Sequence, residues 1–229
     1  MKALFSLLLA STLSLVPPLH AQNPDGSVTF NLFSLEGLSM MDIFTFDAAF
    51  AAQHNIEVPI PFQIGAPRDD RLIRFVDGKP SGGAIVQFTY ALEVEGKDTP
   101  VLLENLQVTG ATIPFYKDQA DPAQARQISA ANLARDVLFP RMVADKTAPE
   151  ILTIEAVSAD DVSGIQLIGR FNDPDIGPTL LRAVILPHPD QERSLVIVAM
   201  INLSLVPVRD SATLAQTLTG RMMARFRYL

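Results

Sequence analysis

The pattern of apolar and polar residues predicts a β-strand over residues 84–95, where the two kinds alternate. Val86 and Phe88 fall on one face of an extended chain, and Gln87 and Thr89 fall on the other. A turn with glycine and proline follows, and the apolar run at residues 101–108 is expected to pair back. The pattern therefore predicts two adjacent antiparallel strands.

Four further strand-like runs follow in the second half of the chain. They occupy residues 151–157, 165–171, 180–186 and 195–203. Their connectors are short and rich in turn residues, which favours an antiparallel meander over parallel strands joined by helices. Residues 195–201 are apolar at every position, as expected of a central strand that is covered on both faces. Residues 58–64 also alternate, but Pro59 and Pro61 restrict them to an edge strand or an extended arm.

A first helix is predicted over residues 40–54. Ile43, Phe46 and Phe50 recur at three- and four-residue spacing, which is typical of an amphipathic helix. Ser39 precedes this run and fits the N-terminal position of a capping box that is completed by Asp42.

Two more helices are predicted from their start signals. The Asp-Pro pair at residues 121–122 is expected to begin a helix that ends near residue 138, before Pro140. A last helix is expected to begin at Asp210 or Ser211. Its buried stripe repeats every four residues and consists of Leu214, Leu218, Met222 and Phe226.

These elements together predict an α+β fold. We expect an antiparallel sheet of about five to seven strands with helices packed on it, and a C-terminal helix that closes the fold. The order of the last third, in which three strands precede a capping helix, resembles that of the small α+β sandwiches of the PsbP/Mog1 type. The resemblance implies a sandwich of sheet and helices, and it carries no functional residues with it.

Residues 1–21 have the layout of a secretory signal peptide. Lys2 provides a positive start, residues 3–16 form an uncharged apolar run, and Ala21 has the small side chain that a signal peptidase requires. The apolar run is too short for a permanent membrane-spanning helix. Cleavage after Ala21 is expected to leave residues 22–229 as a single globular α+β domain without an integral membrane segment; a division near residue 119 is the alternative.

The composition narrows the class of protein. The chain has no cysteine, which excludes a disulfide framework, thiolate metal ligands and lipid attachment at a cysteine after the signal peptide. The formal net charge of −7 and the absence of a long basic block argue against a nucleic-acid partner. An exported protein without cysteine is expected in a bacterial periplasm or in the secreted fraction.

No catalytic, cofactor or metal site is predicted. The two histidines beyond the signal peptide, His54 and His188, are interpreted as a helix-end residue and a turn residue. The aspartates at 160–161 and at 173 and 175 lie in successive turns of the meander, at opposite ends of the sheet, so the two groups should not meet as a glycosidase pair. They are interpreted as solvated turn residues, with a weak calcium site at 173 and 175 as the alternative.

Three arginines gather near the C-terminus. They are interpreted as cations that are favoured in the last turn of a helix, and they are Arg221, Arg225 and Arg227.

The aromatic residues of the first predicted helix are interpreted as burial of the helix in the protein's own core, with an apolar groove or partner-binding surface as the alternative. Phe44, Phe46 and Phe50 cover more of the helix than one core-facing stripe requires. The hypothesis is therefore a non-enzymatic binding or assembly module of the bacterial envelope, which holds an envelope protein or a small apolar ligand. The alternative is a periplasmic hydrolase that uses Asp and Glu side chains as acid and base.

Overall fold

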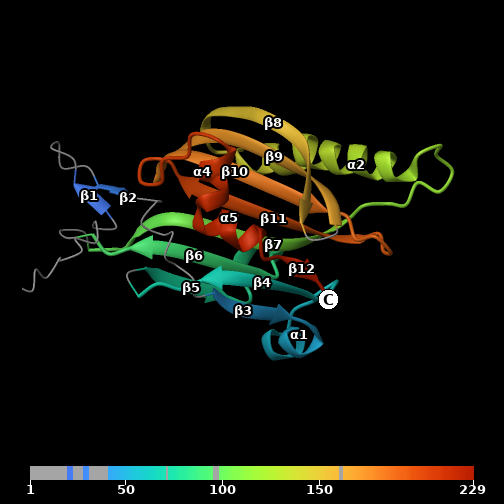
Figure 1. The fold of residues 1–229 in the computed structure, drawn as a ribbon, viewed down its shortest axis with the longest axis horizontal. Helices are drawn as coiled ribbons and strands as arrows, with labels where there is room; N and C mark the ends of the chain where they lie inside the picture. The colour runs from blue at the N-terminus through green and yellow to red at the C-terminus, as the bar shows by residue number, and fades with distance from the viewer. Residues whose placement is uncertain (1–19, 23–27, 31–40, 71, 95–97, 160–161) are drawn as a thin grey trace, which may run out of the picture.

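The computed structural model describes residues 20–22, 28–30, 41–70, 72–94, 98–159 and 162–229, and Figure 1 shows their arrangement. Most of the expected signal peptide, residues 1–19, therefore lies outside the described residues, as do Ser39 and residues 160–161. Strand β1 (His20–Gln22) pairs in antiparallel orientation with β2 (Val28–Phe30). In the described part of the chain, no helix is both long enough and apolar enough to span a membrane.

A seven-stranded antiparallel sheet forms the middle of the molecule. In order across the sheet, its strands are β5 (Ile73–Asp77), β6 (Val86–Leu92), β7 (Val101–Thr112), β11 (Arg193–Asn202), β10 (Gly177–Leu186), β9 (Val162–Asp173) and β8 (Thr147–Ala159). The predicted pairing of β6 with β7 and the predicted meander from β8 to β11 are both confirmed. The predicted fold class, α+β with an antiparallel sheet, is confirmed as well.

Strand β11 lies at the centre of this sheet, between β7 and β10. Its side chains alternate between two separate apolar clusters: Leu195 and Ile197 belong to one, and Val196 and Val198 belong to the other. A strand that serves two cores needs an apolar residue at every position. The prediction of a central strand covered on both faces is therefore confirmed.

Helices and a second, smaller sheet cover the two faces of the large sheet (Figure 1). Helix α2 (Pro122–Leu133) covers one face and contributes Ala130 to the cluster of Val196 and Val198. The other face is covered by α4 (Ser211–Gln216), α5 (Leu218–Met223) and a three-stranded sheet. This sheet has the order β12 (Arg227–Tyr228), β4 (Phe62–Pro67) and β3 (Met41–Phe46).

The predicted helix over residues 40–54 is wrong in its first half. Residues 41–46 form β3, and the helix α1 (Ala48–His54) begins only after Asp47, whose side chain accepts hydrogen bonds from the amides of Ala49 and Phe50. Over so short a run, the three- and four-residue spacing of a helix and the two-residue spacing of a strand place apolar residues at similar positions. The Phe44 and Phe46 rings both contact Phe88, so they share one face as alternate residues of a strand do. The strand predicted at residues 58–64 instead spans Phe62–Pro67 as β4. It is not an edge strand, because it lies between β3 and β12.

Two predicted helix ends differ from the structure. The helix from Pro122 continues past Pro140 through a π turn at Ala134–Leu138 and a short helix α3 (Phe139–Met142). In this wider turn the amide of Phe139 donates to the carbonyl of Ala134, and the shifted pattern accommodates the proline that follows.

The last predicted helix is two helices. Asp210 caps α4 as expected, but the backbone leaves the helical region at Thr217, whose hydroxyl caps α5 by accepting from the amide of Gly220. All four residues of the predicted stripe are nevertheless buried, and they are Leu214, Leu218, Met222 and Phe226.

Candidate functional site

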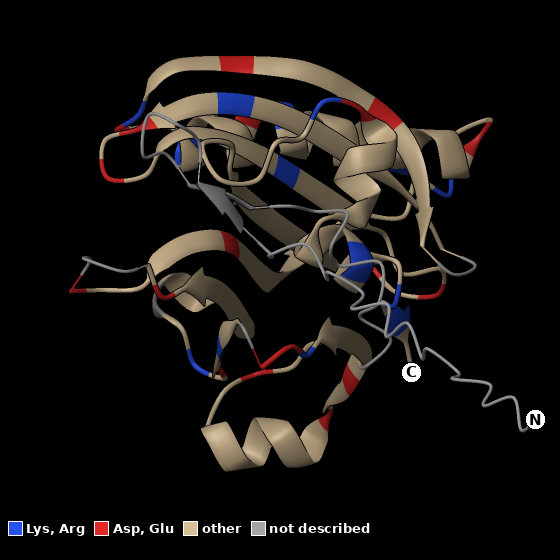
Figure 2. Ribbon diagram, turned by 60° about the vertical axis from the view of Figure 1, so that its left-hand side comes forward, with Lys and Arg blue, Asp and Glu red and all other residues tan. Residues whose placement is uncertain are grey.

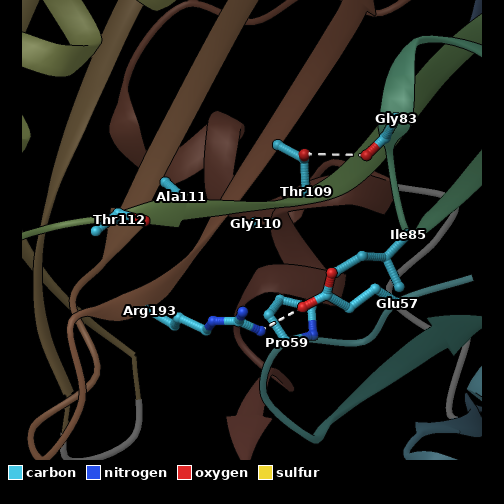
Figure 3. A pocket seen from close by; sticks show the side chains of 9 residues that line it. All are labelled: Glu57, Pro59, Gly83, Ile85, Thr109, Gly110, Ala111, Thr112 and Arg193. Atoms are coloured by element: carbon cyan, nitrogen blue, oxygen red, sulfur yellow. Dashed lines mark hydrogen bonds and ion pairs between the residues drawn. The ribbon is translucent and has the colours of Figure 1, made fainter.

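A recess of about 330 Å³ opens beside the last residues of β7, as Figure 3 shows. Four parts of the chain line it: the end of β7, the segment that leads into β6, the connection between α1 and β4, and the first residue of β11. The lining residues are Glu57, Pro59, Gly83, Ile85, Thr109, Gly110, Ala111, Thr112 and Arg193.

The recess exists because β7 extends beyond the first residue of β6. Val86 at the start of β6 lies opposite Val108, and β7 continues to Thr112. The amide of Ile85 donates to the carbonyl of Val108 at 2.7 Å, and Val86 is the register partner of the same residue, so two residues of one strand face one of the other. Upstream of this irregularity, Gly82 and Gly83 have φ angles of 84° and 81°, a conformation that glycine adopts without a side-chain clash. The chain therefore turns away from β7 just before the two strands would have to pair.

The exposed part of β7 carries backbone groups without partners. The Val108 carbonyl points to β6, whereas the amide of Ile113 donates to Glu192 on the other side, ahead of β11. Successive residues of a strand direct their backbone groups to opposite sides, so Gly110 and Thr112 direct theirs into the recess. No hydrogen bond links these groups to any part of the chain that the structure describes.

The walls of the recess are polar and paired with one another. Glu57 and Arg193 form an ion pair across the opening, and both side chains are exposed (Figure 3). The hydroxyl of Thr109 donates to the carbonyl of Gly83 at 3.4 Å. Pro59 lies over Gly110, where an added β-carbon would come within 3.1 Å of its ring. The recess thus offers hydrogen-bonding groups of the backbone beside a surface ion pair.

The predicted contact residues lie elsewhere, beside the core of the smaller sheet. Phe46 is 1% exposed and stacks on Phe62 at 4.6 Å between ring centroids. Phe44 and Phe50 are half-buried; Phe50 stacks on His54, and Phe44 meets the edge of Phe88. A contact of this region with a partner stays a prediction, and in this fold only Phe44 and Phe50 present any surface to it.

The other predicted chemistry residues are engaged locally. The Asp173 carboxylate accepts hydrogen bonds from the amides of Asp175 and Ile176 and pairs with Lys146 at 3.0 Å. His188 accepts from the amide of Asp190 through Nδ1 within its turn. Among the residues that the structure describes, no three His, Asp or Glu side chains are grouped as metal ligands would be.

The interpretation of the C-terminal arginines is wrong for Arg227. Arg221 lies in the last turn of α5, which ends at Met223. Arg225 lies in the turn directly after this helix, where its amide donates to the carbonyl of Met222 at 3.0 Å. Arg227 belongs to β12, so its position has no explanation in a helix dipole.

Two buried charges had no sequence signal strong enough to single them out. Glu104 on β7 is 0% exposed, and burial raises the pKa of its carboxyl, against the opposing effect of hydrogen bonds from Thr219 and Leu218. Arg126 on α2 donates to the carbonyls of Ile113, His188 and Gln191, and burial lowers its pKa. Glu104 lies in a strand-like run and Arg126 lies between glutamines of a predicted helix, where a charged residue is ordinarily exposed.

Comparison with known proteins gives similarity of structure only. Neither a protein family nor a curated protein matches the sequence. A cyanobacterial PsbP of Synechocystis sp. PCC 6803 is 13% identical, with a TM-score of 0.46 over 84% of this chain and 96% of its own. The Ran-binding protein Mog1p of Saccharomyces cerevisiae is 14% identical, with a TM-score of 0.42 over 82% and 96%.

A third similar structure is LpqN of Mycobacterium tuberculosis, described as involved in cell envelope biogenesis. It is 10% identical, with a TM-score of 0.44 over 87% of this chain and 98% of its own. PsbP and Mog1 are the proteins whose element order the last third of the sequence resembles. At these identities no functional residue is transferred from any of the three.

Proposed function

We propose that the protein is an exported, non-enzymatic binding module that holds an extended segment of a partner protein in the recess beside β7. The observation that carries the proposal is the free strand edge at Gly110 and Thr112. Unpaired backbone donors and acceptors at a sheet edge are satisfied when an extended peptide adds as a further strand. Pro59 fills the space that a side chain of Gly110 would take, whereas the backbone groups of Gly110 and Thr112 point sideways from the strand, into the recess.

The recess is a better candidate than the long outer edge of β8. That edge has two register irregularities, the proline at 149 and the acidic side chains of Glu150 and Glu155. Bulges, prolines and charges are the features by which natural sheets prevent pairing at an edge. The short edge of β7 is less protected: a bulge, Pro59 and the Glu57–Arg193 ion pair border the recess, but Gly110 and Thr112 themselves carry neither a charge nor a proline.

Export is the second part of the proposal and rests on residues 1–21. Protein recovered from the envelope fraction without detergent should begin at Gln22. Retention of Met1 on most of the protein, determined by N-terminal sequencing, would refute export and leave the recess proposal intact.

Peptide binding is tested with a display library of short random peptides that is selected on residues 22–229. Thr112→Pro removes the amide that faces the recess and leaves the hydrogen bonds to β11 in place, since those belong to the alternate residues. Thr112→Val is the matched control, because it removes the hydroxyl and keeps the amide. We expect the selected peptides to bind the control normally and the proline variant about tenfold more weakly. Equal binding to both variants would refute the proposal.

A further inference from the structure

The outer face of the three-stranded sheet combines basic and apolar side chains in two rows. In one row, the stem of Arg225 lies across Gly65 next to Ile43: a β-carbon built on Gly65 would be 3.0 Å from Arg225 Cβ and 3.4 Å from Ile43 Cδ1. In the other row, Arg227 lies opposite Gln63, and Gln63 lies opposite Thr45. A shallow recess of about 340 Å³ opens between these residues.

The second row holds one guanidinium in a fixed orientation. Nε and Nη2 of Arg227 both donate to Oε1 of Gln63, at 3.0 and 2.6 Å, and Nε2 of Gln63 donates to the hydroxyl of Thr45 at 2.9 Å. This chain of hydrogen bonds leaves Nη1 of Arg227 available. A guanidinium that is oriented before binding loses less freedom when a ligand binds.

The guanidinium of Arg225 has no hydrogen bond or ion pair within the described part of the chain. It projects from the same face as Arg227. The amide of Gly65 donates to the carbonyl of Arg225 at 3.3 Å, so Arg225 lies opposite Gly65 as Arg227 lies opposite Gln63, and Gly65 and Gln63 share one face of β4. Figure 2 shows basic segments of the ribbon near the C-terminus. Neither guanidinium group pairs with a carboxylate among the residues that the structure describes, although the chain has 25 acidic and only 18 basic residues.

An apolar side chain completes the face. Ile43 is 61% exposed at the centre of β3, beside the stem of Arg225. Large aliphatic side chains at this exposure are common singly, but here the side chain borders a recess whose charged lining residues, Arg225 and Arg227, are both basic. The combination matches a ligand that carries an anionic group next to an aliphatic one.

From this geometry we infer that the outer face around Arg225, Arg227 and Ile43 is a second binding surface, which takes an acidic segment of a partner protein. A carboxylate lies on the two guanidinium groups, and a neighbouring aliphatic side chain lies over Ile43. Arginine binds carboxylates through paired, charge-assisted hydrogen bonds. The inference is independent of the recess beside β7.

A flat anionic membrane is a poorer occupant than a single acidic segment. Two arginines attract an anionic leaflet only weakly, and screening at physiological salt confines the attraction to roughly 8 Å. The chain has more acidic than basic residues, and this net negative charge opposes the approach of the protein to a negatively charged membrane. A segment with one or two carboxylates fits the concave face without exposing the acidic surfaces to such a plane.

The test measures binding of a fluorescent peptide with alternating glutamate and leucine to residues 22–229 by fluorescence anisotropy. Arg225→Gln removes a side chain that makes no polar contact, so the fold should persist. We expect about tenfold weaker binding for Arg225→Gln, and a further loss when Arg227→Gln is added. Arg141→Gln is the matched control, because Arg141 is an exposed arginine on α3, at the other face of the large sheet.

Three results would overturn the inference. One is unchanged affinity in the double variant. Another is equal binding of a peptide in which lysine replaces glutamate. The last is retention of the protein on phosphatidylglycerol vesicles without binding of the acidic peptide, which would identify the face as a membrane contact. Gln63→Leu keeps both charges and frees Arg227, so intermediate affinity in this variant supports the role of the fixed guanidinium.

Discussion

The buried carboxylate of Glu104 connects the C-terminal helices to the large sheet. It lies on β7 and accepts hydrogen bonds from the amides of Leu218 and Thr219 at 2.9 and 2.8 Å, and from the hydroxyl of Thr219 at 2.7 Å. These are the amides that the start of α5 leaves without helical partners. One side chain from the middle of the sequence thus explains why the predicted last helix breaks at Thr217.

The carboxyl of Glu104 should make stability depend on pH. Burial raises its pKa in the folded state above the ordinary value of 4.5, so the folded protein holds the proton more tightly than the unfolded chain does. Its contribution is therefore complete below that value and is lost as pH rises through the folded-state pKa.

Glu104→Gln removes this titration. Relative to the variant, the wild-type protein should lose about 1.4 kcal/mol for each pH unit over which only the folded state stays protonated. Urea titrations of both proteins between about pH 4 and pH 8 measure the difference. A difference in unfolding free energy that is constant, or that grows in favour of the wild type as pH rises, would contradict the assignment.

At the scale of elements, the sequence pattern predicts the strands of the large sheet better than those of the small sheet. Strands β8 to β11 have alternating or wholly apolar runs with turn residues between them, so local pattern and final structure agree. Strand β3 is only six residues long, and over this length a helical pattern and a strand pattern overlap. Strand β3 pairs with β4, which follows only after α1, and β4 pairs on its other side with β12 from the end of the described chain. No local sequence pattern indicates these pairings.

The central strand β11 gives a direct test of the two-core arrangement. Ile197 is 1% exposed in one cluster and Val198 is 7% exposed in the other. Ile197→Ala should lower the unfolding free energy by about 2–5 kcal/mol through lost burial and the cavity that remains. Val198→Ala, measured by the same denaturant titration, should also destabilise, by a smaller amount because less volume is removed. A loss below about 1 kcal/mol at both positions would show that the strand is not covered on both faces.

At the scale of the whole molecule, the two proposed binding surfaces lie on different sheets. The recess depends on the free end of β7 in the large sheet, and the arginine face depends on the pairing of β12 with β4 in the small one. Neither could be predicted from the sequence, since both arise where segments far apart in the chain meet. The glycines at 82 and 83 signalled a turn, but a turn does not reveal which neighbouring strand it leaves unpaired.

The aromatic residues of the first predicted helix also show that sequence pattern does not determine which side chains meet in the fold. The sequence left core burial and a contact surface open for the aromatic residues in 44–50, and the structure places Phe46 in the protein's own core. Whether an aromatic side chain faces the core or a partner is decided by distant strands such as β4 and β6. Composition alone therefore could not separate a contact surface from a buried one.

The most direct test of peptide binding at β7 is amide hydrogen exchange measured by NMR on isotope-labelled residues 22–229. In the free protein, the amides of Gly110 and Thr112 should exchange faster than that of Ala111, which pairs with β11. Addition of a peptide selected from the display library should protect Gly110 and Thr112 and leave Ala111 unchanged. Binding that leaves the exchange of both amides unchanged would contradict the account.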